Sequence, residues 1–172
     1  AYLSLLAFIR KRGYPHIIRV WTYMADINQG SGDQERYKQF CTGRQQALEE
    51  SHYDPMHYPS ACALGHPQGQ TIIYLIAAKQ AGQHFENPNQ QSAYQYPRQY
   101  GPKSPSFARA TMAHWSTTQS QLYISGTASI TGHTSLHPDD LSAQLKATLD
   151  NINQLLKHVA GLADLSSTPS PS

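Results

Sequence analysis

A long amphipathic pattern near the end of the chain constrains the fold more than any other feature. Apolar residues recur there with the 3.6-residue period of a helix, at Leu141, Leu145, Leu149, Ile152, Leu156 and Val159. Pro138 suits the first turn of a helix, and Asp139 and Asp140 suit the positive end of its dipole. Gly161 provides a stop. The pattern predicts a helix from Pro138 to Gly161 and a disordered polar tail over 162–172.

Apolar and alternating runs upstream predict strands and further helices. The clearest strand is QLYISGTASI, residues 121–130, directly before the last helix. Helices are predicted over 2–13 and 33–51, and strands over 16–28, 61–65, 71–79 and 107–115. An interior glycine, Gly43, predicts a break in the second helix, which would let Arg44 leave the helix line. Strands that alternate with long helices predict an α+β or α/β domain, and α+β is the class we expect.

Composition and spacing exclude several classes of function. A formal net charge of +2 is too small for a nucleic-acid surface, and no apolar run approaches the roughly 20 residues of a membrane span. The two cysteines, Cys41 and Cys62, form no CxxC motif and favour a reduced, cytoplasmic setting over a disulfide framework. The histidines show no zinc-ligand spacing, so no metal is expected. No glycine-rich phosphate loop occurs, and no cofactor is expected.

Three arginines lie in segments rich in glycine, proline and tyrosine, and these are Arg44, Arg98 and Arg109. A guanidinium binds a carboxylate through two parallel hydrogen bonds, and neighbouring tyrosine hydroxyls can orient the oxygens of a small anion. The three arginines together favour a pocket for a small carboxylate. The alternative for each arginine taken alone is a solvated surface position.

Four blocks carry a resemblance to a known family: RYKQFCTGRQQAL, SACALG, ENPNQQSAYQYPRQYGPKSPSFARAT and LYISGTASITGHTSLHPDDLSAQLKATLDNI. Over residues 17–160 the chain resembles the chorismatases, which are chorismate-cleaving hydrolases and 3-hydroxybenzoate synthases related to the RidA/YjgF/L-PSP superfamily. The resemblance implies a RidA-like (chorismate-mutase-like) fold, with residues 1–50 ending an N-terminal half and residues 51–161 forming a C-terminal half that holds the pocket. It also implies chorismate or a related aromatic carboxylate as ligand, and a homotrimer.

The resemblance further implies which residues form the site. The implied substrate-binding residues are Arg44, Tyr96, Arg98, Tyr100, Arg109, Ser125, Thr127 and Gln144. In the family an acidic residue follows the GH pair of the last block and protonates the enolpyruvyl methylene. That position is Thr134 here, and a hydroxyl cannot replace a tuned carboxylic acid. Glu86, Asp139 or Asp140 could substitute, and Cys62 is expected near the pocket, where synthases carry a cysteine.

Two functions therefore stay open on the sequence alone. The first is chorismatase-like release of pyruvate, which gives a dihydroxycyclohexadiene carboxylate or a hydroxybenzoate. The second is a non-catalytic protein that binds small carboxylates, since Thr134 replaces the acid. An imine-deaminase activity fits less well, because the Tyr-, Pro- and Arg-rich segment 94–109 is foreign to that simpler family. The resemblance also implies that family members extend before residue 1 and beyond the last helix.

Overall fold

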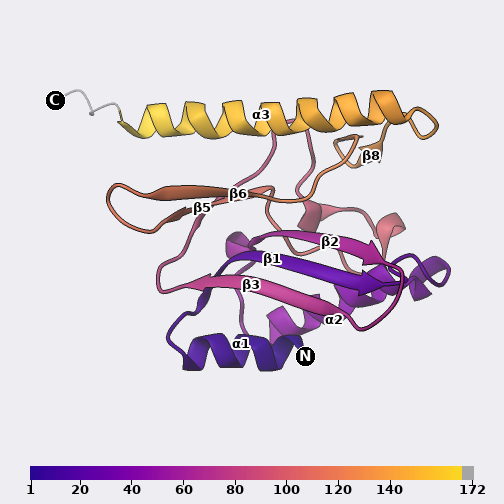
Figure 1. The fold of residues 1–172 in the computed structure, drawn as a ribbon, viewed down its shortest axis with the longest axis horizontal. Helices are drawn as coiled ribbons and strands as arrows, with labels where there is room; N and C mark the ends of the chain where they lie inside the picture. The colour runs from indigo at the N-terminus through magenta and orange to yellow at the C-terminus, as the bar shows by residue number, and fades with distance from the viewer. Residues whose placement is uncertain (168–172) are drawn as a thin grey trace.

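Two three-stranded sheets form the core of the computed structural model, which describes residues 1–167 (Figure 1). In the first sheet, β1 (His16–Ala25) lies between a parallel β2 (Ser60–His66) and an antiparallel β3 (Ile72–Ala78). The second sheet is antiparallel and contains β4 (Gln83–Phe85), β5 (Ala110–His114) and β6 (Ser120–Ile124). A short hairpin of β7 (Ile130–Thr131) and β8 (Thr134–Ser135) follows.

Helices cover the outer side of each sheet, so the predicted α+β class is confirmed (Figure 1). α1 (Tyr2–Lys11) and α2 (Arg36–Glu50) pack on the first sheet, and α3 (Leu141–Ser167) lies over the second. The core cluster below the first sheet contains Leu6, Ile9, Ile17, Val20, Leu48, Tyr58 and Ala61. The cluster under α3 contains Phe85, Ala110, Leu155 and Val159. Four short 3₁₀ helices complete the fold: η1 (Gly32–Gln34), η2 (Pro55–His57), η3 (Ala93–Gln95) and η4 (Arg98–Tyr100).

The two sheets are joined along one seam between β2 and β5. Ser60 pairs with Ala108 in a parallel bridge, and its amide donates to Thr111 Oγ1 at 2.9 Å. The amide of Ala61 donates to Ser125 Oγ at 2.8 Å, and Ser125 Oγ donates in turn to the carbonyl of Ala108. The chain that leaves β6 is thereby fixed against β2 (Figure 1).

Several predicted boundaries are wrong, including the start of the last helix, which is Leu141 and not Pro138. The strand predicted over 121–130 ends at Ile124, because Ser125 uses its hydroxyl in the seam and the chain turns toward the β7–β8 hairpin. α2 runs unbroken through Gly43, since Cys41, Arg44 and Leu48 bury one continuous face that outweighs the cost of the glycine. α3 continues through Gly161 to Ser167. The predicted tail is therefore helical at its start, and residues 168–172 lie outside the described part.

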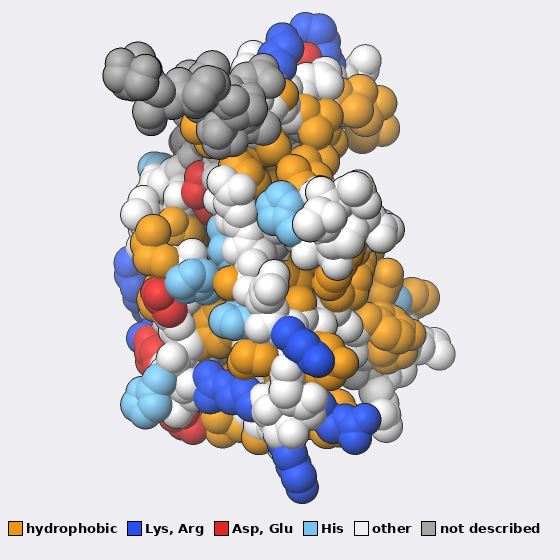
Figure 2. All heavy atoms as spheres, turned by 90° about the vertical axis from the view of Figure 1, so that its left-hand side faces the viewer, with side chains coloured by type: hydrophobic (Ala, Val, Ile, Leu, Met, Phe, Trp, Pro, Cys, Tyr) orange, Lys and Arg blue, Asp and Glu red, His pale blue; other side chains and the backbone are white. Residues whose placement is uncertain are grey.

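The two faces of β1 and of α3 differ in how deeply their side chains are buried. On β1, Val20 and Thr22 are buried while Trp21 and Tyr23 are half-buried, as the alternation predicts. Figure 2 shows hydrophobic side chains that reach the surface in the layer of α3. The exposed leucines of this helix are Leu141, Leu145, Leu149, Leu156 and Leu162. None of the helices in residues 1–167 combines the length and the apolarity that a membrane span requires.

Candidate functional site

A cavity of about 620 Å³ opens between α2, β2 and the loops that follow β4 and β6. This volume falls in the range of sites for small organic molecules. Its walls combine two arginines with four aromatic rings and several small side chains. The lining residues used below are Glu35, Tyr37, Lys38, Arg44, Cys62, Tyr96, Gln99, Tyr100, Phe107, Arg109, Gly126, Thr127 and Ile130.

Arg44 brings a buried positive charge to the cavity wall. The residue is only 5% exposed, and its Nε and Nη2 have no hydrogen-bond partner among the described residues. Its guanidinium lies 5.1 Å from the ring centroid of Phe40. Burial raises the pKa of Tyr2, of Tyr37 and of the Cys41 thiol, so these neighbours stay neutral beside it. Arg44 is therefore a buried cation with unused hydrogen-bond donors on the cavity wall.

Arg109 supplies a second buried guanidinium, held in one orientation. Its Nη2 donates to the carbonyl of Gln91 at 2.8 Å and to the Tyr96 hydroxyl at 2.9 Å. The rings of Phe107 and Tyr96 lie 5.4 and 5.8 Å from the guanidinium carbon, and the Nε is left without a partner. A fixed guanidinium loses little entropy when it binds a planar anion. The guanidinium of Arg109 is therefore held in one orientation by contacts within the protein.

Glu86 lies in a neighbouring cavity of about 100 Å³, together with His84. Burial raises the pKa of Glu86, and the charge of Arg109 opposes this rise. Its Oε2 has no partner within residues 1–167.

Amide side chains hold the loop after β6 as the floor of the cavity. Gln90 Nε2 donates to Thr127 Oγ1 at 3.1 Å, and Asn151 Nδ2 donates to the carbonyls of Ala128 and Ile130 at 3.0 and 2.9 Å. A Cβ on Gly126 would come within 3.1 Å of the Cβ of Cys62, so the loop approaches β2 more closely than an alanine there would allow. The floor is rigid because α3 and the 87–91 loop both fix it.

Six of the residues predicted for the site line this cavity. They are Arg44, Cys62, Tyr96, Tyr100, Arg109 and Thr127. Arg44 reaches the cavity from within the unbroken helix α2. The predicted break at Gly43 is wrong. Tyr100 Oη lies 2.6 Å from the His133 carbonyl and 3.1 Å from its Nδ1, so this ring ties the β7–β8 turn to the cavity wall.

Other predicted residues lie outside the cavity wall. Arg98 directs its guanidinium to Asp33, which replaces a ligand carboxylate as its partner. Ser125 is buried in the seam between the sheets, where both its hydrogen bonds go to the backbone. Gln144 donates to the carbonyls of His137 and Pro138, and so closes the turn before α3.

The predicted acidic positions are also separated from the cavity wall. Thr134 is exposed on β8, and Glu86 lies on the far side of Arg109 in the smaller cavity. Asp140 accepts a hydrogen bond from the Ala143 amide at 2.9 Å and so caps α3, while Asp139 is exposed in the same turn. Among the residues that line the large cavity, Glu35 is the single carboxylic acid, and Lys38 Nζ lies 3.4 Å from its Oε2.

Sequence reasoning missed part of the wall. Glu35, Tyr37 and Lys38 come from the start of α2, where the helical pattern alone did not distinguish a cavity face from a solvent face. Phe107 was assigned to a strand that begins only at Ala110. The supporting amides Gln90 and Asn151 gave no local signal, because their partners lie 21 to 40 residues away in the chain.

Comparison with known proteins shows that the chain is similar to chorismatases and to a 3-hydroxybenzoate synthase. A family model described as chorismatase FkbO/Hyg5-like, N-terminal, matches residues 1–77. The chain is 36% identical over 161 residues to a 3-hydroxybenzoate synthase of Streptomyces hygroscopicus, which covers 91% of this chain and 47% of the relative. It is 36% identical over 158 residues to a chorismatase of Streptomyces rapamycinicus, with 90% and 47% covered.

A solved structure supports the same relationship. The crystal structure of a chorismatase at 1.08 Å resolution superimposes with a TM-score of 0.85 at 37% sequence identity, over 90% of this chain and 47% of that one. The chain spans about half the length of the curated relatives it matches.

Proposed function

Because the chain is homologous to chorismatases over nine tenths of its length, we propose that its cavity binds chorismate or a closely related aromatic carboxylate. The observation that carries this proposal is Arg44, a buried guanidinium with two unpartnered nitrogens and only neutral neighbours. Arg109 offers a second, pre-oriented guanidinium. Chorismate carries two carboxylates on an apolar ring system, which suits two arginines set among aromatic side chains.

The proposed activity is chorismatase-like release of pyruvate. Protonation of the enolpyruvyl methylene and addition of water to the resulting cation give a hemiketal, whose collapse breaks the ether bond and releases pyruvate and a dihydroxycyclohexadiene carboxylate. Loss of one molecule of water from that ring would give the aromatic hydroxybenzoate. In this cavity Glu35 is the candidate proton donor, since it is the carboxylic acid on the wall. Thr127 and Tyr100 are candidates to orient ring oxygens, and Cys62 lies where it can contact the ring. Placement in the RidA superfamily stays a prediction of the sequence.

Pyruvate release and binding are measured separately to test this function. Chorismate is incubated with the protein, and pyruvate is followed with lactate dehydrogenase and NADH, beside the Glu35→Gln and Thr134→Glu variants. Pyruvate from the parent chain and not from Glu35→Gln supports the reaction and its donor. Calorimetric binding without pyruvate, even from Thr134→Glu, would restore the non-catalytic alternative, which the relatives do not support. Folded protein that neither binds nor turns over chorismate refutes the proposal.

Assembly and setting also belong to this proposal. A homotrimer is supported by the exposed leucines of α3, which leave one side of this helix apolar. A cytoplasmic setting is supported by Cys41 and Cys62, both of which are free thiols.

A further inference from the structure

We propose that Asp33 is a positioning residue for ligand binding, which acts through Arg98 to hold one wall of the cavity against the other. The inference rests on the proposed function for its ligand, but the tether itself can be tested without one. Asp33 and Arg98 are 65 residues apart in the sequence and lie on η1 and η4, two segments that lead directly into lining residues of the cavity.

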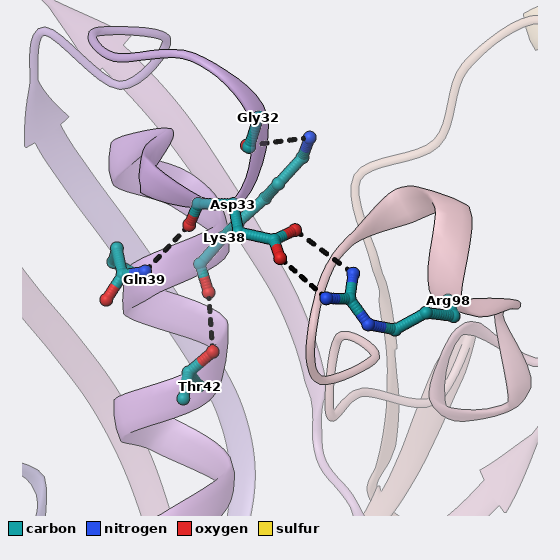
Figure 3. Close-up of polar contacts among 6 residues, drawn as sticks. All are labelled: Gly32, Asp33, Lys38, Gln39, Thr42 and Arg98. Atoms are coloured by element: carbon teal, nitrogen blue, oxygen red, sulfur yellow. Dashed lines mark hydrogen bonds and ion pairs between the residues drawn. The ribbon is translucent and has the colours of Figure 1, made fainter.

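The two side chains form a bidentate ion pair (Figure 3). Arg98 Nη1 donates to Asp33 Oδ1 at 3.0 Å, and Nη2 donates to Oδ2 at 2.5 Å. Arg98 holds the pKa of Asp33 below its ordinary value through this hydrogen bond, so the carboxylate stays ionised. The geometry uses both oxygens of the acid and both terminal nitrogens of the guanidinium, which is the strongest form of such a pair.

Asp33 is fixed to the beginning of α2. Its backbone carbonyl accepts from Gln39 Nε2 at 2.7 Å, and the neighbouring Gly32 carbonyl accepts from Lys38 Nζ at 3.1 Å (Figure 3). Thr42 Oγ1 in turn donates to the carbonyl of Lys38. The segment that carries Asp33 is therefore attached to the first turn of α2 by hydrogen bonds.

Arg98 lies in a segment whose conformation is equally restricted. Pro97 precedes it, and Tyr100 and Gly101 donate their amides to the carbonyls of Pro97 and Arg98. Gly101 has a φ of 147°, and a Cβ there would meet the Lys38 side chain at 3.3 Å. The 97–101 turn thus sits directly on the side chain of a residue from α2.

The ion pair joins two sets of lining residues. Asp33 is two residues from Glu35 and shares its segment with Tyr37, whereas Arg98 lies between Tyr96 and Tyr100. Among the described residues, the other ion pair between this loop and α2 is Lys103–Glu49, which lies near the last turn of the helix. If the Asp33–Arg98 pair is broken, no described ion pair remains between the tyrosine wall and the first turn of α2, and we expect that wall to move more freely. Since both side chains are partly exposed, we expect a small effect on global stability and a larger one on ligand release.

The test compares Asp33→Asn with an Asp33→Arg/Arg98→Asp charge swap. Asp150→Asn on α3 is the matched control, because it removes a surface pair with Lys146 and neither residue lines the cavity. Amide hydrogen exchange at Tyr100 and Gly101 reports the tether without ligand, and stopped-flow displacement of bound chorismate reports release. We expect Asp33→Asn to speed both about two- to fivefold, the upper range for an exposed ion pair with good geometry. The swap should restore most of the change, and 0.5 M NaCl should mimic Asp33→Asn in the parent.

The outcomes separate this inference from the proposed function. If the parent binds no chorismate, the proposed function fails, and hydrogen exchange alone decides whether the tether exists. If Asp33→Asn leaves exchange at Tyr100 and Gly101 unchanged, the tether is refuted. If exchange speeds up while chorismate release does not, Asp33 is purely structural and the positioning role is overturned.

Discussion

Tyr96 and Arg109 form a hydrogen-bonded pair on the cavity wall, with the guanidinium Nη2 2.9 Å from the phenol oxygen and the ring 5.8 Å from the guanidinium carbon. Tyr96→Phe keeps the ring and removes the acceptor. We expect chorismate affinity to fall about fivefold, the loss of one modest hydrogen bond, with little change in melting temperature. Isothermal titration calorimetry and thermal melts measure the two quantities. A large loss of stability would show instead that this pair holds the loop together.

Arg44→Met tests the buried charge. Methionine keeps much of the volume and removes a guanidinium that no described acid balances. Removal of a buried, unpaired charge should leave the melting temperature unchanged or higher, whereas affinity for chorismate should fall about 10- to 150-fold. Calorimetry and melts of the same preparation give the comparison. A variant that melts lower and binds as before would contradict the assignment of Arg44 to an anion.

Two glycines should respond in opposite directions to alanine. Gly43 lies inside α2 with open space around its missing Cβ, so Gly43→Ala should stabilise the protein by about 0.5–1 kcal/mol. Gly126→Ala places a Cβ 3.1 Å from the Cβ of Cys62 and should destabilise it. Urea unfolding of the three proteins checks the order. Equal stability of the two variants would show that the floor of the cavity accommodates the Cβ at position 126 without loss of stability.

His84 should make the protein sensitive to acid. Burial, with a smaller effect of His57, lowers the pKa of His84 to about 4, against about 6.5 when unfolded. The unfolded chain therefore binds more protons between these values, and stability falls as the pH drops from 6.5 toward 4. His84→Asn removes the titrating ring and keeps a polar group beside Thr111. It should reduce the acid-induced loss in the free energy of unfolding by at most about 3 kcal/mol, and by less because His84 is partly reached by solvent. Urea unfolding of the parent and of His84→Asn at pH 7 and pH 4.5 measures this difference. An equal loss of stability in both proteins would contradict the assignment to His84.

Self-association through α3 should depend on its exposed leucines. Leu145 and Leu149 are 59% and 51% exposed and lie one turn apart on the helix. If they form an interface in the proposed trimer, Leu149→Glu should give monomers without loss of the fold. Light scattering reads the mass, and circular dichroism serves as the check on folding. A parent chain that is already monomeric at about 19 kDa would refute the trimer.

The sequence predicted the elements better than the contacts between them. The periodic leucines located α3, and alternation located β1, because both patterns are set by residues close together in the chain. The ion pair between Arg98 and Asp33 was not predictable, since the two residues are 65 positions apart and no local pattern links them. Ser125 was misassigned for the same reason, as its partners Ala61 and Ala108 come from other strands.

The break predicted at Gly43 shows a different limit. Intrinsic propensity penalises a glycine inside a helix by about 1 kcal/mol, but burial of Leu48 and Cys41 on the same face contributes more. The prediction from local helix propensity was therefore wrong at Gly43, because packing of α2 against the sheet determines the conformation there. Arg44 and Arg109 line one cavity, whereas Arg98, which lies between two tyrosines, pairs with Asp33, so a tyrosine-rich setting alone does not identify a cavity arginine.

The seam between β2 and β5 determines when the cavity can exist during folding. Its hydrogen bonds from Ser60 to Thr111 and from Ala61 to Ser125 close loops of 51 and 64 residues. Contacts of such high sequence separation form after local helices and hairpins, because the chain must first lose the entropy of loop closure. The floor of the cavity is therefore assembled among the last steps of folding. A ligand can protect the finished domain, yet it has nothing to bind while the two sheets are still apart.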